Sequence, residues 1–343
     1  MNRILYQLSY AAMCGQAVVR HRLISFISIQ RAAPFVKKFF EIFVVFFAGL
    51  SYDRPKELIN MKRIVTMQDI SCLGKCSLTV IHPTVSAMGV ECAVVPTEVL
   101  STHTAFPGPA VRDLRSFLRP LFDHWEQIGA SFDGILTGYL ANEAQAALAL
   151  ELIDRFGQEA FLVQDPAMGD HGRLYSGIGP EMVAAHRALC ARADLVIPNL
   201  TEGCMLAGIP YEDRTDLEFC QQIAQSLLKT SAKAVLLTGY SPDPGTVGFY
   251  YSDGKQEFCH AGPKLPRTCH GTGDLFAAVT MGGVMRGLTV PQAGVLAVEF
   301  IHSAIAKTGE NSRFGVAFEG ELGNLSARLE RKLQEGALWQ ANM

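Results

Sequence analysis

The sequence predicts an α/β fold in which a mostly parallel central sheet carries helices on both faces. Short apolar runs rich in Val, Ile and Leu alternate along the chain with longer stretches of helical periodicity. These runs lack the polar–apolar alternation of a half-solvated strand, so the strands are expected to be buried on both faces. The chain has 343 residues, 49% hydrophobic and 18% charged, which allows a large core and excludes intrinsic disorder.

Six apolar runs after residue 60 are predicted as the strands of this sheet. In chain order they are 63–68, 92–96, 134–137, 160–164, 195–198 and 234–238. Two further runs, 247–251 and 256–260, flank Ser252-Asp253-Gly254 and predict a β-hairpin with a tight Asp-Gly turn.

Helical stretches separate the strands. They are predicted at 111–128, 142–156, 180–191, 217–229, 273–286 and 290–308. Asn142 is expected to cap its helix, with Glu143 in the first turn, and Thr289 is expected to cap the last helix, with Pro291 near its start. Without an internal repeat or linker, this alternation predicts one doubly wound domain.

The first sixty residues differ from the rest in charge. They hold 8 Lys+Arg and 3 Asp+Glu, a net +5, which leaves 22 and 30, a net −8, for the rest of the totals of 30 and 33. Three interpretations stay open: a non-structural extension, an organelle-targeting peptide or a membrane-surface anchor. The expected organisation is an extension over 1–60 that is not part of the fold, a domain over 61–325 and a C-terminal tail over 326–343.

The net charge and the cysteines indicate which partners and which cellular compartment to expect. The net charge of −3 at pH 7 argues against a nucleic-acid partner, and the domain after residue 60 shows no membrane-spanning pattern. Nine cysteines without a C-x-x-C pair predict free thiols in a reducing compartment, so a cytoplasmic location is expected.

Polar or glycine-containing segments follow all six predicted strands. They are 68–71, 97–104, 137–139, 165–170, 199–202 and 238–240. Any one of them could be a capped turn. Because ligands in doubly wound sheets bind at the carboxyl ends of the strands, six such segments together indicate a binding site at one edge.

The segment Gly271-Thr272-Gly273-Asp274 directly precedes an apolar helix. Two glycines let successive backbone N–H groups converge, and the helix N-terminus adds positive potential, so the segment can hold phosphoryl oxygens. Asp274 would place a base beside them. The sequence has no Walker A motif, no complete Rossmann fingerprint and no protein-kinase H-R-D or D-F-G motif. An ordinary Asp in a helix cap is the alternative.

Several motifs occur in a fixed order around this segment. Asp165-Pro166 with Gly169-Asp170, Pro198-Asn199 with Glu202, Thr238-Gly239 and then 271–274 resemble the ribokinase-like superfamily in their order and spacing. Within it, the segments 67–69, 101–104, 136–139 and 271–276 resemble the pyridoxal kinases, which phosphorylate vitamin B6. The likeness covers about 61–325 and implies a ribokinase-like fold.

The resemblance implies roles for the residues of the phosphate side. Asp274 would take the proton of the substrate hydroxymethyl group, and Gly271, Thr272 and Gly273 would form the anion hole for the γ-phosphate. Asp165, Asn199, Glu202, Thr238 and Thr272 would contact ATP, and Glu202 and Asp165 would hold Mg²⁺. Glu202 could instead only open the helix after Pro198.

On the substrate side, the resemblance places six residues around the pyridine ring: Gln68, Asp69, His103, Thr104, Tyr139 and Tyr175. Residues 169–179 would form a lid over the site. His103 could instead be a surface-loop histidine, and Tyr175 a packing residue of the lid. One departure is that Asp69 and Ile70 follow Gln68, where better-known members have Ser and His, which leaves the preferred vitamer open.

The resemblance therefore implies ATP-dependent phosphorylation of pyridoxal, pyridoxine or pyridoxamine, a step of vitamin B6 salvage to pyridoxal 5′-phosphate. ATP, Mg²⁺ and a monovalent cation such as K⁺ are the expected cofactors, and a homodimer is the expected assembly. The alternatives are hydroxymethylpyrimidine kinase, another small-molecule kinase of the superfamily, and a non-catalytic ligand-binding protein. The intact 271–274 segment argues against the last.

Overall fold

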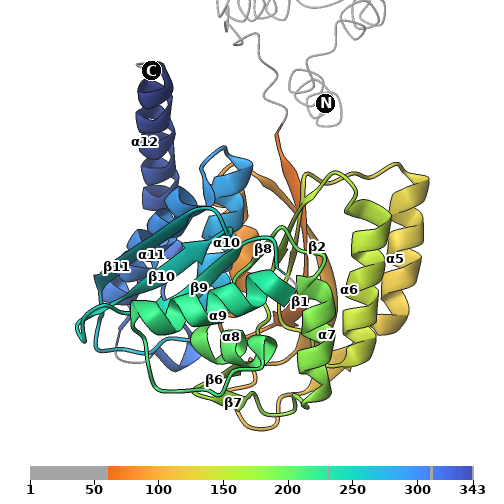
Figure 1. Cartoon of the computed structure of the whole chain (residues 1–343). Helices are drawn as coiled ribbons and strands as arrows, with labels where there is room; N and C mark the ends of the chain where they lie inside the picture. The colour runs from red at the N-terminus through yellow and green to blue at the C-terminus, as the bar shows by residue number, and fades with distance from the viewer. Residues whose placement is uncertain (1–60, 231, 310–311, 342–343) are drawn as a thin grey trace, which may run out of the picture. The chain divides into compact units, whose positions relative to one another are not determined.

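A computed structural model describes residues 61–230, 232–309 and 312–341 (Figure 1). The predicted extension over 1–60 lies outside the described residues. Among the described helices, none has an apolar stretch long enough to cross a membrane.

A nine-stranded sheet forms the centre of the described chain, with the order β11-β10-β9-β8-β5-β4-β1-β2-β3. The strands are β1 (Arg63–Ser71), β2 (Glu91–Leu100), β3 (Val111–Asp113), β4 (Gly134–Thr137), β5 (Phe161–Gln164), β8 (Leu195–Val196), β9 (Val235–Tyr240), β10 (Thr246–Ser252) and β11 (Glu257–Pro263). From β9 to β2 neighbouring strands pair in parallel. At the two ends of the sheet the pairing is antiparallel: β3 pairs with β2, and β10 pairs with β9 and β11. The predicted mostly parallel sheet and the predicted hairpin are confirmed.

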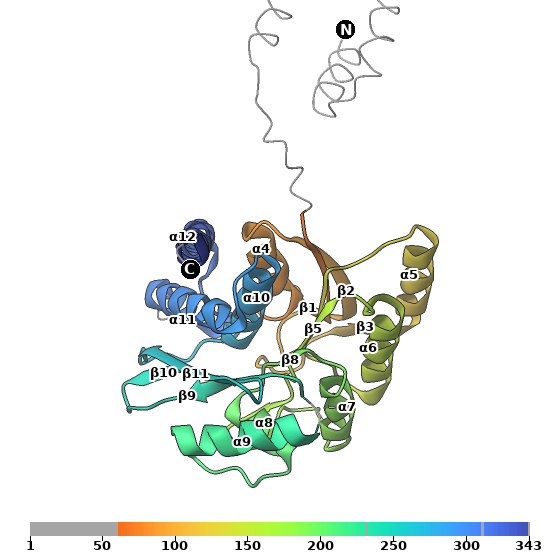
Figure 2. The same ribbon diagram turned by 45° about the horizontal axis from the view of Figure 1, so that its top comes forward.

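Helices cover both faces of the sheet (Figures 1 and 2). One layer holds α5 (Arg115–Gln127), α6 (Glu143–Phe156), α7 (Glu181–Cys190), α8 (Leu200–Ala207) and α9 (Leu217–Thr230). The other holds α4 (Leu78–Ala87), α10 (Thr272–Met285), α11 (Val290–Lys307) and α12 (Leu322–Ala341). Short 3₁₀ turns lie at η2 (Ser312–Phe314) and η3 (Glu319–Glu321), and β6 (Gly169–Asp170) and β7 (Arg173–Leu174) form a separate hairpin.

Strand β1 shows why the apolar runs lack alternation. Val65 and Met67 are fully buried in the core under the α5–α9 layer, whereas Ile64 is fully buried in the core under the α4–α12 layer. Both faces of the strand therefore need apolar side chains, as a parallel sheet between two helical layers requires.

Both predicted helix caps are confirmed. Asn142 Oδ1 accepts a hydrogen bond from the backbone N–H of Gln145 at 3.1 Å. Thr289 forms a capping box with Gln292, and Pro291 lies in the first turn of α11.

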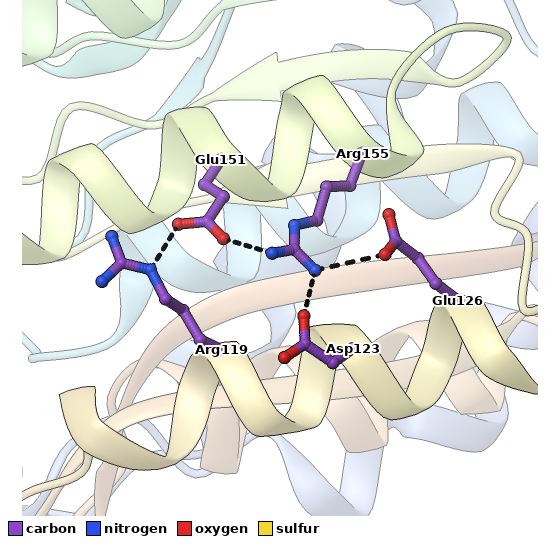
Figure 3. Close-up of polar contacts among 5 residues, drawn as sticks. All are labelled: Arg119, Asp123, Glu126, Glu151 and Arg155. Carbon is purple, nitrogen blue, oxygen red and sulfur yellow. Dashed lines mark hydrogen bonds and ion pairs between the residues drawn. The ribbon is translucent and has the colours of Figure 1, made fainter.

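An ion-pair network joins α5 and α6 (Figure 3). Arg155 of α6 binds Asp123 at 2.6 Å and Glu126 at 3.3 Å on α5, and it also binds Glu151 at 2.7 Å within α6. Arg119 of α5 reaches Glu151 at 2.9 Å. Single exposed pairs stabilise little, but a connected set fixes how the two helices pack.

The structure differs from the predicted elements in four main respects. The segment predicted as a helix over 111–128 begins with β3, and α5 starts only at Arg115, because Asp113 accepts the backbone N–H of Arg115 at 2.8 Å and interrupts the helix there. Helix α4 was not predicted; it is apolar rather than amphipathic and contains Pro83. Strands β1 and β2 run three and four residues past their predicted ends, at Gln68 and Pro96, to Ser71 and Leu100.

The fourth difference concerns the predicted tail. The expected boundary after residue 325 falls inside α12, and both Leu325 and Leu329 are fully buried. Helix α12 packs against α4 and α11 in the second core. At least this first part of the segment 326–343 therefore belongs to the fold.

Candidate active site

The segment Gly271–Asp274 begins α10 at the edge of the sheet where the parallel strands end. Gly271 has a φ of 86°, and a Cβ at this position would lie 2.3 Å from the backbone oxygen of Lys75. Only glycine fits this left-handed, closely packed position. Gly273 is exposed, and a Cβ there would meet no atom within 4 Å, so open space lies in front of the helix N-terminus. An anion can therefore approach the first backbone N–H groups of α10.

Asp274 lies half-buried in the first turn of α10. Burial raises the pKa of this carboxyl from 3.8 to about 6; a hydrogen bond with the Ser77 backbone opposes the rise, and the charge of Asp69 adds to it. Asp274 is thus mostly ionised at neutral pH and yet a stronger base than an exposed aspartate, as suits a general base.

Glu202 is a buried carboxylate that organises the start of α8. Its Oε2 accepts the N–H of Asn199 at 2.9 Å, while Asn199 Oδ1 accepts the N–H of Glu202 at 2.9 Å, which completes a capping box. Its Oε1 accepts the N–H groups of Met168 at 3.0 Å and Gly169 at 3.5 Å. Burial raises the Glu202 pKa to about 7 against these hydrogen bonds. The structure thus shows the capping role, and the metal role stays a prediction.

Asp165 follows β5 and is only 8% exposed. Its Oδ1 accepts the N–H of Ala167 at 3.3 Å. Burial, and then the charges of Glu202 and Asp274, raise the pKa of Asp165 well above its ordinary value. The fold therefore brings together three carboxylates from three separate motifs. Among the described residues, however, no three acidic, His or Cys side chains lie close enough to hold a metal directly.

The β6–β7 hairpin and the residues after it occupy the predicted lid segment, beside α8 (Figure 1). The N–H of Gly172 binds the hydroxyl of Thr201 at 2.9 Å, which ties the hairpin to that helix. Tyr175 is 40% exposed; burial, and then Glu202 and Asp170, raise the pKa of its phenol. The Tyr175 phenol therefore lies within electrostatic range of the acidic residues, and its role toward a ligand stays a prediction.

Two predicted phosphate contacts are threonines, Thr238 in β9 and Thr272 at the start of α10. Thr238 in β9 is half-buried, and its N–H binds the Pro198 oxygen at 2.9 Å, which places it in a bridge with Asn199. Thr272 donates its hydroxyl to the Cys269 oxygen at 3.3 Å, so this side chain closes the turn into α10. Phosphate contact by either threonine stays a prediction.

Three of the predicted ring contacts lie close together. Gln68 and Asp69 are buried near the end of β1. They lie inside the strand, whereas the strand was predicted to end at Gln68. Gln68 packs on Gly138, where a Cβ would approach its amide to 2.4 Å. Tyr139 is half-buried next to it, and burial followed by the charges of Glu98 and Asp69 raises its pKa to about 12. The Tyr139 phenol therefore keeps its proton at neutral pH.

His103 is not a surface-loop histidine, because it is only 4% exposed. Its Nε2 pairs with the Arg313 oxygen at 3.1 Å, and its ring lies 4.8 Å from the rings of Phe106 and His270. Burial, and then His270, lower the His103 pKa. The ring therefore packs between its own loop and the segments that contain His270 and Arg313. Thr104 is exposed beside it. Ligand contact by either residue stays a prediction.

Two residues within electrostatic range of Asp69 were not assigned a role from the sequence. Glu98 is buried near the end of β2, where its Oε2 accepts the Gln145 side-chain amide at 3.5 Å. Cys76 is half-buried, and burial followed by the charges of Asp274 and Asp69 raises the pKa of its thiol. A glutamate between apolar residues near the end of β2 was the available signal for Glu98, whereas nothing in the local pattern marked Cys76.

Comparison with known proteins finds similar sequences and similar solved structures. Residues 84–317 match the family described as phosphomethylpyrimidine kinase. A pyridoxine/pyridoxal/pyridoxamine kinase of Bordetella pertussis is 30% identical over 263 residues, which are 72% of this chain and 89% of that protein. The crystal structure of pyridoxal kinase from Lactobacillus plantarum has a TM-score of 0.71 and 32% identity, covering 79% of this chain and 98% of that one. A Bacteroides thetaiotaomicron protein crystallised with pyridoxal has a TM-score of 0.73 and 33% identity, covering 77% and 96%.

Proposed function

The chain belongs to the phosphomethylpyrimidine kinase family, in the ribokinase-like superfamily, and from this membership we infer that it is an ATP-dependent kinase of the pyridoxal kinase type. The acceptor is the hydroxymethyl group of a vitamin B6 vitamer. The phosphorylated product belongs to the salvage of vitamin B6 to pyridoxal 5′-phosphate.

The position of Asp274 carries this proposal. Its carboxylate lies in the first turn of α10, next to a helix N-terminus that is open to solvent at Gly273. The N–H groups of this turn would hold the transferring phosphoryl oxygens, while Asp274 accepts the proton of the attacking hydroxyl. A primary alcohol needs such a base at neutral pH.

Mg²⁺ is part of the proposal, with Asp165 and Glu202 as the residues that would hold it. Both are buried, and burial raises the pKa of each, so a divalent cation would relieve the cost of ionising them. Glu202 already accepts backbone N–H groups on both oxygens. Contact through metal-bound water therefore fits better than direct coordination, in keeping with the preference of Mg²⁺ for retaining water. When bound, the ion would neutralise charge on the phosphates.

A substrate screen tests the proposed function. We expect ATP consumption with at least one of pyridoxal, pyridoxine and pyridoxamine, at a higher kcat/KM than with hydroxymethylpyrimidine. The relatives named as pyridoxal kinases support this order. A tenfold preference for the pyrimidine would move the protein to the alternative activity, and a folded protein that consumes ATP with none of the four would contradict the kinase assignment.

A requirement for a monovalent cation such as K⁺, a homodimeric state and a cytoplasmic location also belong to this proposal. Activity assays with K⁺ replaced by tetramethylammonium, the molar mass in solution and imaging of the tagged protein test them separately.

A further inference from the structure

Two buried acidic side chains lie opposite one another at an irregularity between β1 and β2. Gln68 pairs with Pro96 and Ile70 pairs with Val99, so the single residue Asp69 faces two residues of β2, one of which is Glu98. Asp69 is 5% exposed and Glu98 is 7% exposed. Bulges of this kind re-aim side chains and are frequent next to active sites.

Neither carboxylate forms an ion pair in the part of the chain that the structure describes. Asp69 accepts the Ser71 hydroxyl at 3.2 Å and also bonds the Ser77 side chain, whereas Glu98 accepts only the long bond from Gln145 at 3.5 Å. Burial raises the pKa of both, and Asp69 adds to the rise at Glu98. Arg115 acts on Glu98 from a distance, but its guanidinium is bound to Asp113 at 2.5 Å. Negative charge at this point is therefore left uncompensated by the protein, which is costly in a buried place.

The residues that precede the two acidic residues in the sequence also carry polar atoms without partners. Gln68 precedes Asp69 and Thr97 precedes Glu98; both residues are fully buried, and Gln68 Oε1 and Thr97 Oγ1 have no hydrogen-bond partner among the described residues. Buried polar atoms without partners within the protein usually bind a ligand or ordered water. Asp69 also raises the pKa of the proposed base Asp274, and both Glu98 and Asp69 raise the pKa of Tyr139, so the pair lies within electrostatic range of a proposed ring contact.

We propose that Asp69 and Glu98 bind the protonated amino group of the substrate, so that the enzyme selects pyridoxamine over pyridoxal and pyridoxine. This inference rests on the proposed function. The three vitamers differ only in the group on the ring carbon next to the one that carries the phosphorylated hydroxymethyl. Of an aldehyde, a hydroxymethyl and an aminomethyl group, only the last is a cation at neutral pH. Its ammonium has three donors and can donate a hydrogen bond to each carboxylate, and its single positive charge offsets one of their two negative charges.

The test measures kcat/KM for the three vitamers on the wild-type protein, on Glu98→Gln and on a control, Glu91→Gln. Glu91 lies at the other end of the same strand, exposed and paired with Arg63 at 2.9 Å. We expect the wild type to prefer pyridoxamine. Glu98→Gln should lower kcat/KM for pyridoxamine about tenfold or more, because a charged hydrogen bond is lost. The same change should leave pyridoxine unaffected, and Glu91→Gln should leave all three unaffected.

Three results would overturn the inference, and they differ from each other. Turnover of the vitamers without a wild-type preference for pyridoxamine contradicts the selection and leaves the kinase activity standing. An equal loss for all three vitamers in Glu98→Gln, with the melting temperature lowered, indicates a structural role only. Turnover of none of the vitamers overturns the proposed function and this inference with it. If Glu98→Gln does not fold, Asp69→Asn and the wild-type preference carry the test.

Discussion

Asp274 is the residue on which the proposed chemistry depends most. Asp274→Asn keeps the shape of the side chain but removes the base, so we expect kcat to fall by about 10² or more, within the usual range for general-base catalysis. The vitamer KM should change little, and the melting temperature at neutral pH should not fall, because a buried charge is removed. A plain capping role predicts the reverse: normal kcat with a stability loss of roughly 0.5–2 kcal/mol. Steady-state kinetics and thermal unfolding of the one variant separate the two.

The raised pKa of Asp274 also predicts opposite pH trends for activity and stability. The base must be ionised, so kcat/KM should fall as the pH drops through about 6. The folded state binds this proton more tightly than the unfolded chain, whose pKa is near 3.8, so the Asp274 contribution to stability should decrease as the pH rises from about 4 to 6. Asp274→Asn should lose that part of the pH dependence of unfolding. A kcat/KM that stays flat from pH 5 to 8 would contradict the assignment.

Glu202 combines a visible structural role with a predicted metal role. Glu202→Gln should weaken the apparent affinity for Mg²⁺ more than the affinity for the vitamer, because the negative charge is lost while the shape is kept. It should also lower the melting temperature, since an amide cannot accept all the backbone N–H groups that the carboxylate accepts. Glu218→Gln, on an exposed position of α9, is the control. Equal Mg²⁺ titrations for Glu202→Gln and wild type would leave Glu202 as a cap alone.

At the scale of the helix, two caps of the same kind have different consequences. Thr289 caps α11 through Gln292, whereas Asn199 caps α8 within the proposed site. Thr289→Ala should cost about 1 kcal/mol of stability and leave kcat unchanged. Asn199→Ala should cost a similar amount and lower activity as well, because its amide also holds the Gly169 oxygen at 2.9 Å. Paired unfolding and kinetic measurements check this; a normal kcat in Asn199→Ala would place α8 outside the catalytic machinery.

The sequence predicted elements well where one pattern sufficed. Apolar runs such as 134–137 coincide with a strand, and Asn142 and Thr289 cap the helices they were expected to cap. Helix α4 was not predicted, because it contains Pro83 and lacks an amphipathic pattern. Its apolar composition reflects its position between the sheet, α10 and α12. Strand β3 was not predicted, because its three residues are exposed and show no apolar pattern. They form a strand through their pairing with β2.

The site was predictable as a set of strand ends but not as a geometry. The ordered motifs placed Asp165, Glu202 and Asp274 at one edge, and the fold brings them within electrostatic range. The burial of His103 and the partnership of Asp69 with Glu98 depend on loops and on a bulge. Long-range contacts of this kind leave no local periodicity, so a single sequence could not have revealed them.

For the whole molecule, two truncations should behave differently. A protein that starts at Met61 should fold and keep its activity, because the described sheet begins at Arg63. A protein that stops after Leu325 should not fold stably, because it loses the fully buried Leu329 and most of α12. Soluble yield, unfolding curves and kcat test both. Insoluble protein from the Met61 start would show that residues 1–60 belong to the core or to an interface.

The packing of α12 on α4 also has a consequence for how the chain folds while it is being synthesised. Helix α4 is one of the first elements to leave the ribosome, and Val80, Ile81 and Val85 on it belong to the same core as Leu325 and Leu329 of α12. The apolar side chains of α4 therefore cannot be fully buried until α12, one of the last segments of the sequence, has been translated. A nascent chain in that interval presents an incomplete core, the kind of surface that chaperones bind and that aggregates when none is available.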